Sequence, residues 1–306
     1  MFLCCGEALI DMLPRETREG AACFEPHAGG SIFNTAIALG RLGTPVRFFT
    51  GLSTDFFGQM LREELSASRV DLTHVVESDR PTTLAFVKLE NGHARYAFFD
   101  ENTSGRMLSE ADLPELPSAV TGLFFGSISL VSEPGADTYL SLLEREAAQR
   151  LIMVDPNIRQ GFIKDEARYR ARLARAFGKA DLVKLSDEDL HWLEGEGDLS
   201  DLARRVLALG PKVVFVTEGG NGARAVFAGG ERRVASQKVT VADTVGAGDT
   251  FSAGIMTALY RAGAASKAAV AEITPELIEA ALELGAKAAA VTVSRPGANP
   301  PWDHEL

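Results

Sequence analysis

The chain has 306 residues, of which 46% are hydrophobic and 24% are charged, and its formal net charge is −11. A chain of this length can bury a large core without disulfides or metals. Its acidic balance argues against nucleic acid and anionic membranes as partners. Glu7 and Asp11 come too early for a secretory signal, and no apolar run approaches the roughly 18 residues of a membrane span. We therefore expect a cytoplasmic protein.

The apolar pattern predicts strands that alternate with helices along most of the chain. Short apolar runs typical of buried strands lie at 2–5, 46–50, 123–125, 151–154, 182–185, 213–217 and 239–241. Apolar residues at helical spacing mark helices at 31–42, 56–66, 133–149, 198–209, 250–260 and 275–290. Such alternation is typical of an α/β fold with a doubly wound, mainly parallel sheet and helices on both faces.

Two regions interrupt this alternation. The β-prone segments 83–89 and 95–99 flank Asn91-Gly92, a strong hairpin signal, and the stretch 20–27 is also irregular. We expect a single domain over residues 1–306, with a small β-sheet lid formed by about 12–28 and 80–101. A lid that closes over a bound substrate would exclude water from the reaction.

The three cysteines do not form a recognisable site. Cys4 and Cys5 are neighbours on a predicted strand, so they point to opposite faces and cannot easily bridge each other. Together with Cys23 they match neither a disulfide framework nor a zinc-binding pattern. We assign them no function, and expect Cys4 and Cys5 to be core residues.

The most informative segment is DTVGAGDTF at 243–251, between a predicted strand and a predicted helix. Gly246, Ala247 and Gly248 let the backbone approach an oxyanion closely, and free amides at a helix start attract negative charge. Asp249 would repel a phosphate bound there, unless it acts as a base that deprotonates an alcohol during phosphoryl transfer. The alternative is an ordinary helix cap after a tight turn.

A second glycine turn, GGSIFN at 29–34, precedes the first predicted helix. Gly30 permits close backbone approach to a ligand, and Asn34 offers a donor and an acceptor to sugar hydroxyls. Asp11 follows the first strand, where ligands bind in such sheets, and could accept from a sugar hydroxyl. The glycine turn or Asp11 alone is weak evidence for a sugar-binding site. The chain lacks the P-loop GxxxxGK[ST], a GxGxxG after its first strand and a GxSxG elbow.

GGSIFN and DTVGAGDTF together resemble the two signature regions of the ribokinase-like (PfkB) carbohydrate kinases, and the likeness extends from Gly6 to about Ala298. It is greatest to bacterial fructokinases. The resemblance implies a ribokinase-like fold with a β-sheet lid, and transfer of the γ-phosphoryl group of ATP to a primary sugar hydroxyl. It further implies Mg²⁺ with ATP, possible stimulation by K⁺, and a possible homodimer formed through the lid.

The resemblance also implies roles for individual residues. The catalytic base falls on Asp249, and the anion hole on the amides of Gly246, Ala247 and Gly248. Sugar contacts are implied for residues of both glycine turns, the lid and the DPNIR segment at 155–159, namely Asp11, Gly30, Asn34, Arg95, Phe99 and Arg159. Arg159 would lie near the phosphates or the sugar, and the alternative is that it pairs with Asp155.

On the nucleotide side, the likeness is looser. Thr217, Gly219 and Gly222 match a T-x-G-x-x-G loop that contacts ATP, although a hairpin turn explains the same residues. Ser186 and Asp189 stand where many relatives have N-x-x-E, which implies that Asp189 binds Mg²⁺ through water.

Three details of this side stay open. The shorter reach of Asp189 leaves Glu188 as a competing candidate for the metal. Ala286 replaces an Asn found in many relatives beside the nucleotide. Asp243 and the carbonyls around 293–298 would form the monovalent cation site, unless Asp243 only caps the turn.

The leading hypothesis is ATP-dependent phosphorylation of D-fructose to fructose 6-phosphate. An alternative is a 2-keto-3-deoxygluconate kinase, whose substrate carboxylate needs a free cation such as Arg95, Arg106 or Arg159. The acidic segment 99–102 favours a neutral sugar. A nucleoside kinase is disfavoured by the lack of an extra aromatic cluster, and a dinucleotide oxidoreductase by the missing glycine fingerprint. A non-catalytic sugar-binding relative is more remote, because Asp249 is present.

Overall fold

The computed structural model describes residues 1–90 and 93–306, and the side chains outside 88–96. Its main sheet has the order β14-β13-β12-β11-β10-β9-β1-β4. The strands are β1 (Phe2–Cys5), β4 (Val46–Phe49), β9 (Gly122–Gly126), β10 (Leu151–Asp155), β11 (Leu182–Ser186), β12 (Val213–Thr217), β13 (Ala223–Phe227) and β14 (Gly230–Val234). The strands from β12 to β4 are parallel, whereas β13 and β14 are antiparallel.

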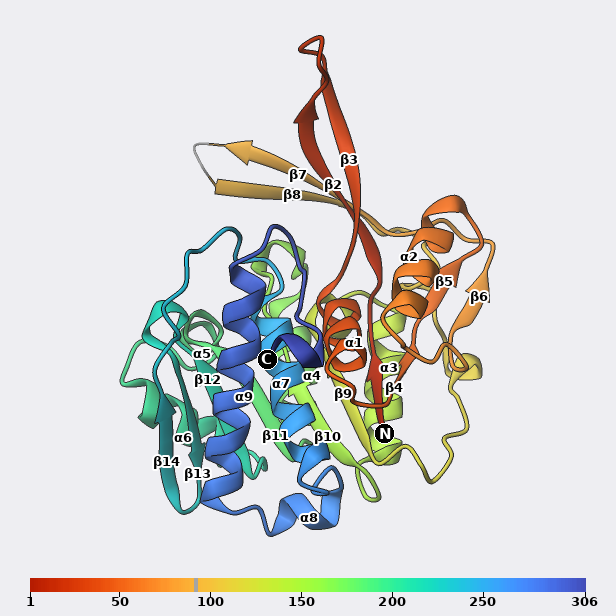
Figure 1. Cartoon of the computed structure of the whole chain (residues 1–306). Coiled ribbons are helices and arrows are strands. Elements are labelled where there is room, and N and C mark those ends of the chain that lie inside the picture. The colour runs from red at the N-terminus through yellow and green to blue at the C-terminus, as the bar shows by residue number, and fades with distance from the viewer. Residues whose placement is uncertain (91–92) are drawn as a thin grey trace.

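Helices cover both faces of this sheet (Figure 1). One face packs against α1 (Ser31–Arg41), α2 (Phe56–Ala67), α7 (Ala247–Arg261), α8 (Lys267–Ala271) and α9 (Pro275–Val293). The other packs against α3 (Gly135–Glu146), α4 (Glu166–Phe177), α5 (Asp187–Glu194) and α6 (Leu199–Leu207). Cys4 lies in the first core and Cys5 in the second, as expected for neighbours on a strand. The predicted doubly wound α/β fold is confirmed.

A separate four-stranded sheet projects beyond the main body (Figure 1). Its order is β3-β2-β7-β8, with β2 (Leu9–Glu16), β3 (Ala22–Gly29), β7 (Leu84–Glu90) and β8 (His93–Phe99). The β7 and β8 strands pair antiparallel, as the Asn91-Gly92 signal predicts, although those two residues lie outside the described part. A short third sheet pairs β5 (Gly51–Ser53) with β6 (Val76–Ser78).

The sequence-based element assignment fails in several places: it omits α5, for example, and two other failures have a clear physical reason. The apolar residues 239–241 form no strand, because Val239 and Val241 stay exposed in an irregular segment. The helix α4 is missed because four arginines and four alanines make up most of its sequence, EARYRARLARAF. Its large buried apolar side chains are Tyr169, Leu173 and Phe177, which is too few for a clear apolar stripe. No helix in the described part of the chain is long and apolar enough to cross a bilayer.

The topology fixes where a ligand can bind. Strand order reverses between β1 and β9, so the connections that leave their carboxyl ends diverge and open a crevice. Glu7 follows β1 and Ser127 follows β9, and both line a cavity at this edge. The lid strands β2 and β7 rise from the same edge.

Candidate active site

Two cavities meet at the turn that precedes α7. A polar cavity of about 780 Å³ is lined by residues of both glycine turns, the lid base and the 157–162 segment, including Asp11, Gly30, Asn34, Arg159 and Asp249. A second cavity of about 480 Å³ has mainly apolar walls. Thr244, Ala247 and Gly248 line both cavities. A group held at this turn is therefore accessible from both sides.

The turn exposes backbone amides to the two cavities. Gly246 has a φ of 76°, and a Cβ there would lie 2.7 Å from the Cβ of Ala298, so glycine is required. The amide of Ala247 donates to the Thr244 carbonyl at 3.4 Å. Within the described residues, the amides of Gly246 and Gly248 make no internal hydrogen bond. The start of α7 thus has donors free for an anion.

Asp249 is buried beside these amides and is held in one orientation. Its Oδ1 accepts from Ser31 Oγ at 2.6 Å, and its Oδ2 accepts from Asn34 Nδ2 at 2.9 Å. Burial raises the pKa of Asp249, while the Ser31 and Asn34 hydrogen bonds and the charges of Lys184 and Arg159 act in the opposite direction. The two glycine motifs, far apart in sequence, therefore converge on one carboxylate.

The first glycine pair makes room for two acidic side chains. A Cβ at Gly29 would lie 2.4 Å from Oδ2 of Asp11, so the glycine leaves space for that carboxylate. Gly30 has a φ of 109° and lies against the Glu7 backbone. Burial raises the pKa of Asp11 to about 6, with the charge of His27 opposing it.

Glu7 was not predicted as a site residue, and it orders the start of α1. Its Oε1 accepts from the Ser31 amide at 2.9 Å, and its Oε2 accepts from the Ser129 hydroxyl. A carboxylate at this position satisfies amides that the helix leaves free. Because Ser31 and Asn34 lie on the first turn of α1, Glu7 indirectly positions the donors that hold Asp249. The only sequence signal is a polar residue just beyond β1.

Lys184 was also missed, although a lysine inside an otherwise apolar strand is a usable signal. It is buried in β11, and its Nζ donates to Asp155 Oδ2 at 2.9 Å. A Cβ at Gly248 would lie 2.9 Å from the same ammonium, which places the charge directly behind the turn. Burial opposes the charged form, but the carboxylates of Asp155, Asp189 and Asp249 raise the pKa of Lys184 overall.

The remaining predicted sugar contacts are placed differently. Arg159 lines the polar cavity and does not pair with Asp155, which is bound by Lys184 instead. Phe99 does not line this cavity; its neighbour Phe98 does, because successive side chains on a strand alternate in direction. The side chain of Arg95 lies outside the described part.

The predicted nucleotide residues divide into two groups. Thr217, Gly219 and Gly222 line the apolar cavity, and so does Ala286. Ser186 does not; its hydroxyl accepts from the Asp189 amide and caps α5. Sequence reasoning missed the apolar wall of this cavity, which includes Val239, Val241, Phe251, Ala290 and Val293.

Both predicted metal residues are bound to backbone amides. Asp189 accepts from Ile158 and Ser186 at 2.8 Å and 3.0 Å. Asp243 accepts from Val245 and Gly297 at 3.0 Å each, so it ties the 243–249 turn to the 293–298 segment. Glu188 is exposed. In the described part of the chain, no cluster of three or more His, Cys, Asp or Glu could hold a metal on its own.

Comparisons with known proteins identify the family. Residues 1–305 match the pfkB family carbohydrate kinase. The chain belongs to this family.

Its similarity to individual members is extensive. The chain is 52% identical to a fructokinase of Rhizobium leguminosarum bv. trifolii over 278 residues, which cover 91% of this chain and 85% of that protein. It is 31% identical to a fructokinase of Klebsiella pneumoniae, covering 89% of this chain and 88% of the relative. The crystal structure of Xylella fastidiosa fructokinase with bound ATP has a TM-score of 0.87 at 26% identity, covering 97% of this chain and 93% of the other. The predicted ribokinase-like fold and kinase class are thereby confirmed.

Proposed function

We propose that this carbohydrate kinase is a fructokinase, which transfers the γ-phosphoryl group of ATP to the C6 hydroxyl of D-fructose. The observation that carries the proposal is the position of Asp249, buried beside free amides where a polar and an apolar cavity meet. The polar cavity suits a sugar, and the apolar cavity suits an adenine ring. The 52% identity to the Rhizobium fructokinase supports fructose as the acceptor.

Asp249 acts as the general base. The fructose C6 oxygen attacks the γ-phosphorus, the bond from that phosphorus to the bridging oxygen of ATP breaks, and ADP leaves. The hydroxyl proton passes to Asp249 and then to solvent, so the products are ADP, fructose 6-phosphate and a proton. The Ser31 and Asn34 hydrogen bonds hold the carboxylate in one orientation, and they oppose the rise in its pKa that burial causes. Asp11 and Asn34 hold sugar hydroxyls from the cavity wall.

The phosphoryl group is stabilised by a preorganised turn. In this mechanism, the free amides of Gly246 and Gly248 donate to the transferring phosphoryl oxygens, and the Ala247 amide joins them by giving up its long bond to the Thr244 carbonyl. These amides lie at the positive end of the α7 dipole. The Lys184 ammonium lies behind Gly248 and adds a full positive charge within a buried environment. Arg159 is exposed and lines the polar cavity from the segment after β10. In this mechanism its guanidinium contacts the transferring phosphoryl group from that side.

Cations complete the proposed mechanism. Lys184 is a buried cation near three buried carboxylates, those of Asp155, Asp189 and Asp249. The negative charge of this group exceeds its positive charge, so a divalent cation that enters with ATP would balance the difference. Mg²⁺ would be held by the phosphates and, through water, by Asp189, and when bound it neutralises phosphate charge. Asp243 and the 293–298 backbone would hold K⁺ beside the turn.

The charges of the polar cavity favour a neutral sugar over 2-keto-3-deoxygluconate. Among its described lining residues, Arg159 is the only cation, facing the carboxylates of Glu7, Asp11 and Asp249. Arg106, another candidate for a substrate carboxylate, pairs with Asp100 at 2.9 Å and lines a different cavity. A substrate carboxylate would therefore add a negative charge where three are already present.

The proposal is tested by ADP release with saturating MgATP and a panel of fructose, glucose, ribose, 2-keto-3-deoxygluconate and a nucleoside. We expect the highest kcat/KM with fructose, and a product phosphorylated at C6 by ³¹P NMR. A clear preference for the keto acid would replace fructose as the substrate. No turnover with any acceptor, despite ATP and sugar binding by calorimetry, would favour the non-catalytic alternative.

We also propose that the lid joins two copies of this chain. Phe24, Phe86 and Phe99 form an edge-to-face row across the lid sheet, with ring centroids 5.0 Å and 5.4 Å apart. Phe24 and Phe99 are 49% and 60% exposed, although large exposed aromatics are costly in water. The same row on a second copy would cover them. Sedimentation should give a dimer that Phe24→Asp converts to monomer; a monomeric wild type would refute the idea.

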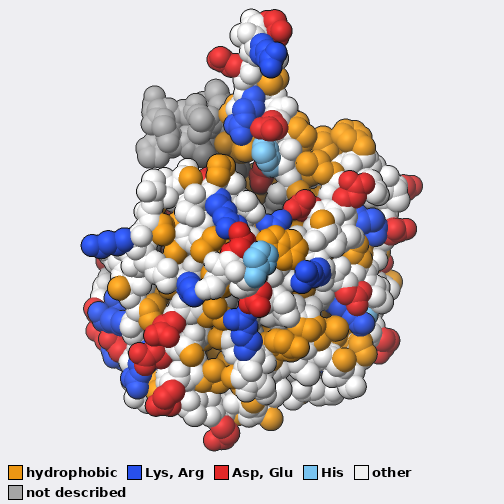
Figure 2. Space-filling model, viewed as in Figure 1, with side chains coloured by type: hydrophobic (Ala, Val, Ile, Leu, Met, Phe, Trp, Pro, Cys, Tyr) orange, Lys and Arg blue, Asp and Glu red, His pale blue; other side chains and the backbone are white. Residues whose placement is uncertain are grey.

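On the face shown in Figure 2, acidic and basic side chains are interspersed, and basic side chains do not gather into one large area. This distribution fits small-molecule substrates better than a nucleic acid partner.

A further inference from the structure

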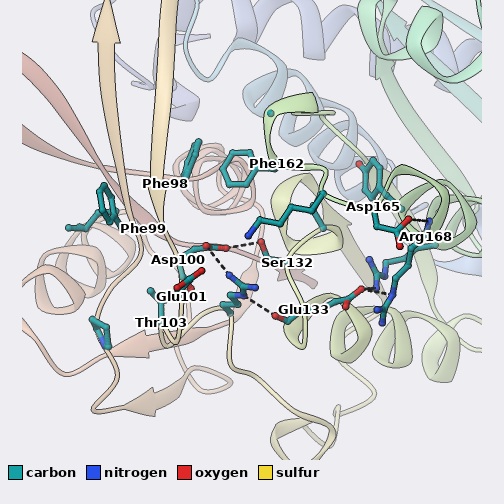
Figure 3. Close-up of a pocket in the computed structure, with 18 of the residues that line it drawn as sticks. Phe98, Phe99, Asp100, Glu101, Thr103, Ser132, Glu133, Phe162, Asp165 and Arg168 are labelled. Atoms are coloured by element: carbon teal, nitrogen blue, oxygen red, sulfur yellow. Dashed lines mark hydrogen bonds and ion pairs between the residues drawn. The ribbon is translucent and has the colours of Figure 1, made fainter.

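A third cavity lies behind the polar cavity, at the base of the lid. Its volume is about 750 Å³, and it is bounded by β8, the 161–165 segment, α4 and the residues 131–133 (Figure 3). The proposed mechanism does not use it. We call it the outer cavity.

The outer cavity and the polar cavity share three lining residues, Phe98, Gly161 and Phe162. The rings of Phe98 and Phe162 lie side by side, with centroids 3.7 Å apart and ring planes tilted by 55° (Figure 3). Phe98 comes from the lid strand β8, and Phe162 from the segment after β10. The ring pair is therefore a wall between the two cavities.

This wall belongs to a small apolar cluster at the base of the lid. Leu9, Ala85 and Ile128 form its buried centre, and both phenylalanine rings pack against it. Leu9 and Ile128 also line the polar cavity. The wall therefore packs against residues of both the lid and the main body.

The chemistry behind the wall is polar but balanced in charge. Its charged lining residues are four cations and four acids, namely Arg106, Lys164, Arg168, Arg172, Asp100, Glu101, Glu133 and Asp165. Several pair with one another, as Arg172 does with Glu133 at 2.6 Å. Such a lining offers both donors and acceptors to hydroxyl groups, but no net attraction to an ionic group.

We propose that the Phe98–Phe162 pair sets the size limit of the acceptor, and that the outer cavity can hold an additional neutral sugar unit once the wall is opened. This proposal rests on the proposed fructokinase activity. The Phe98–Phe162 pair would contact the end of the sugar that does not react. A monosaccharide fits in front of the wall. A substituent on that monosaccharide collides with the rings, and a steric collision excludes a ligand more strongly than a missing contact weakens it.

The test measures kcat/KM for fructose and for sucrose, whose fructosyl unit has a free C6 hydroxyl and carries a neutral glucosyl unit. Phe162→Ala and Phe98→Ala should raise the sucrose-to-fructose ratio of kcat/KM at least tenfold. Fructose 1-phosphate carries a charged group in place of the neutral glucosyl unit. In the same variants, its kcat/KM relative to that of fructose should rise much less than the value for sucrose.

Phe99→Ala is the matched control. Phe99 is adjacent on the same strand and lines the outer cavity, but not the polar cavity. It should leave the ratio unchanged. Where an alanine variant unfolds, judged by its melting temperature, Phe162→Leu keeps an apolar side chain and is expected to raise the ratio less, but in the same direction.

The outcomes separate this inference from the proposed function. An unchanged ratio in folded Phe162 and Phe98 variants that still phosphorylate fructose would overturn the wall, as would an equal gain in Phe99→Ala. A wild type inactive on fructose would refute the fructokinase proposal instead. The wall would then be tested with the monosaccharide that the wild type does use and its neutral glucoside, and the same ratio would decide.

Discussion

Asp155 and Asp249 are both buried carboxylates at the same edge of the sheet, yet their partners differ in kind. Asp155 ends β10 and accepts from the Lys184 ammonium at 2.9 Å and from Ser252 Oγ at 3.1 Å. Burial raises the pKa of both acids. The Lys184 ammonium, in direct contact, stabilises the ionised form of Asp155 and offsets the free-energy cost of removing that carboxylate from water. That contact also occupies the carboxylate, so Asp155 is unsuited to accept a substrate proton.

Among the residues that the structure describes, the side chains that donate to the Asp249 carboxylate are both neutral, namely the Ser31 hydroxyl and the Asn34 amide. Neutral donors fix the orientation of a carboxylate without cancelling its charge. Asp249 also lines the polar cavity, and Asp155 does not. Of two equally buried acids, the one suited to proton abstraction is therefore the one whose charge is oriented but not neutralised.

The largest expected effect comes from Asp249→Asn. Asparagine keeps the size and can still contact Ser31 and Asn34, but it cannot take a proton. We expect kcat to fall by about 10²–10⁴-fold, with sugar affinity within a few-fold of wild type. Steady-state ADP release gives kcat, and calorimetry gives the sugar Kd. A variant that keeps a tenth or more of its turnover would remove Asp249 from the base role.

Lys184→Met tests the role of the ion pair between Lys184 and Asp155. Removal of the ammonium leaves Asp155 buried without its cation, which costs about 3–5 kcal/mol in the free energy of unfolding. Urea denaturation measures this loss. The double variant Lys184→Met/Asp155→Asn removes the stranded charge as well, so it should recover part of the stability. If the single variant is as stable as wild type, the pair does not stabilise the fold.

Much of the fold follows from the sequence because the buried parallel strands are continuous apolar runs. The bounds of β10, β11 and β12 each lie within one residue of the predicted runs. The turn at 243–249 is predictable for a related reason, since glycines are needed where a backbone approaches a ligand or another segment closely, as Gly246 approaches Ala298. Asp249 could be proposed as a base because a carboxylate at an anion-binding turn is otherwise unfavourable.

The residues that support Asp249 could not be predicted in the same way. Ser31 and Glu7 act through contacts between segments far apart in the chain, and Lys184 reaches the turn only because β11 ends behind it. Neighbours on a strand alternate in direction, so the sequence could not decide whether Phe98 or Phe99 lines the polar cavity. The apolar run 239–241 indicated a strand, whereas its valines line the apolar cavity.

Asp11→Asn distinguishes binding from chemistry. The pKa of Asp11 is raised to about 6 by burial, so the carboxylate gains its proton as the pH falls through about 6. We expect the wild-type KM for fructose to rise below that pH. Asp11→Asn should raise KM about tenfold or more at about pH 8, because hydrogen bonds to a charged group contribute about 1.5–3 kcal/mol.

In the same variant, KM should no longer change between about pH 5 and about pH 7. The raised pKa of Asp249 affects kcat rather than KM, so the two acids are separated by which constant responds. A variant whose KM keeps the wild-type pH dependence would show that another group is titrating.

Ser31→Ala gives the smallest and most specific effect. Its hydroxyl donates to Asp249 Oδ1 at 2.6 Å, so its loss removes a contact that lowers the pKa of the carboxylate. The acid limb of the kcat profile should therefore move to higher pH, because a carboxylate that loses a donor holds its proton more tightly.

Thr35→Val is the control for Ser31→Ala. The Thr35 hydroxyl lies 3.0 Å from the backbone carbonyl of Ser31 and 3.3 Å from that of Asp249, and it does not contact the Asp249 carboxylate. Thr35→Val should leave the acid limb in place. Equal shifts in the two variants would mean that the profile reports general loosening of α1 against α7. A shift confined to Ser31→Ala would instead assign the acid limb to Asp249, since only that variant alters the donors around its carboxylate.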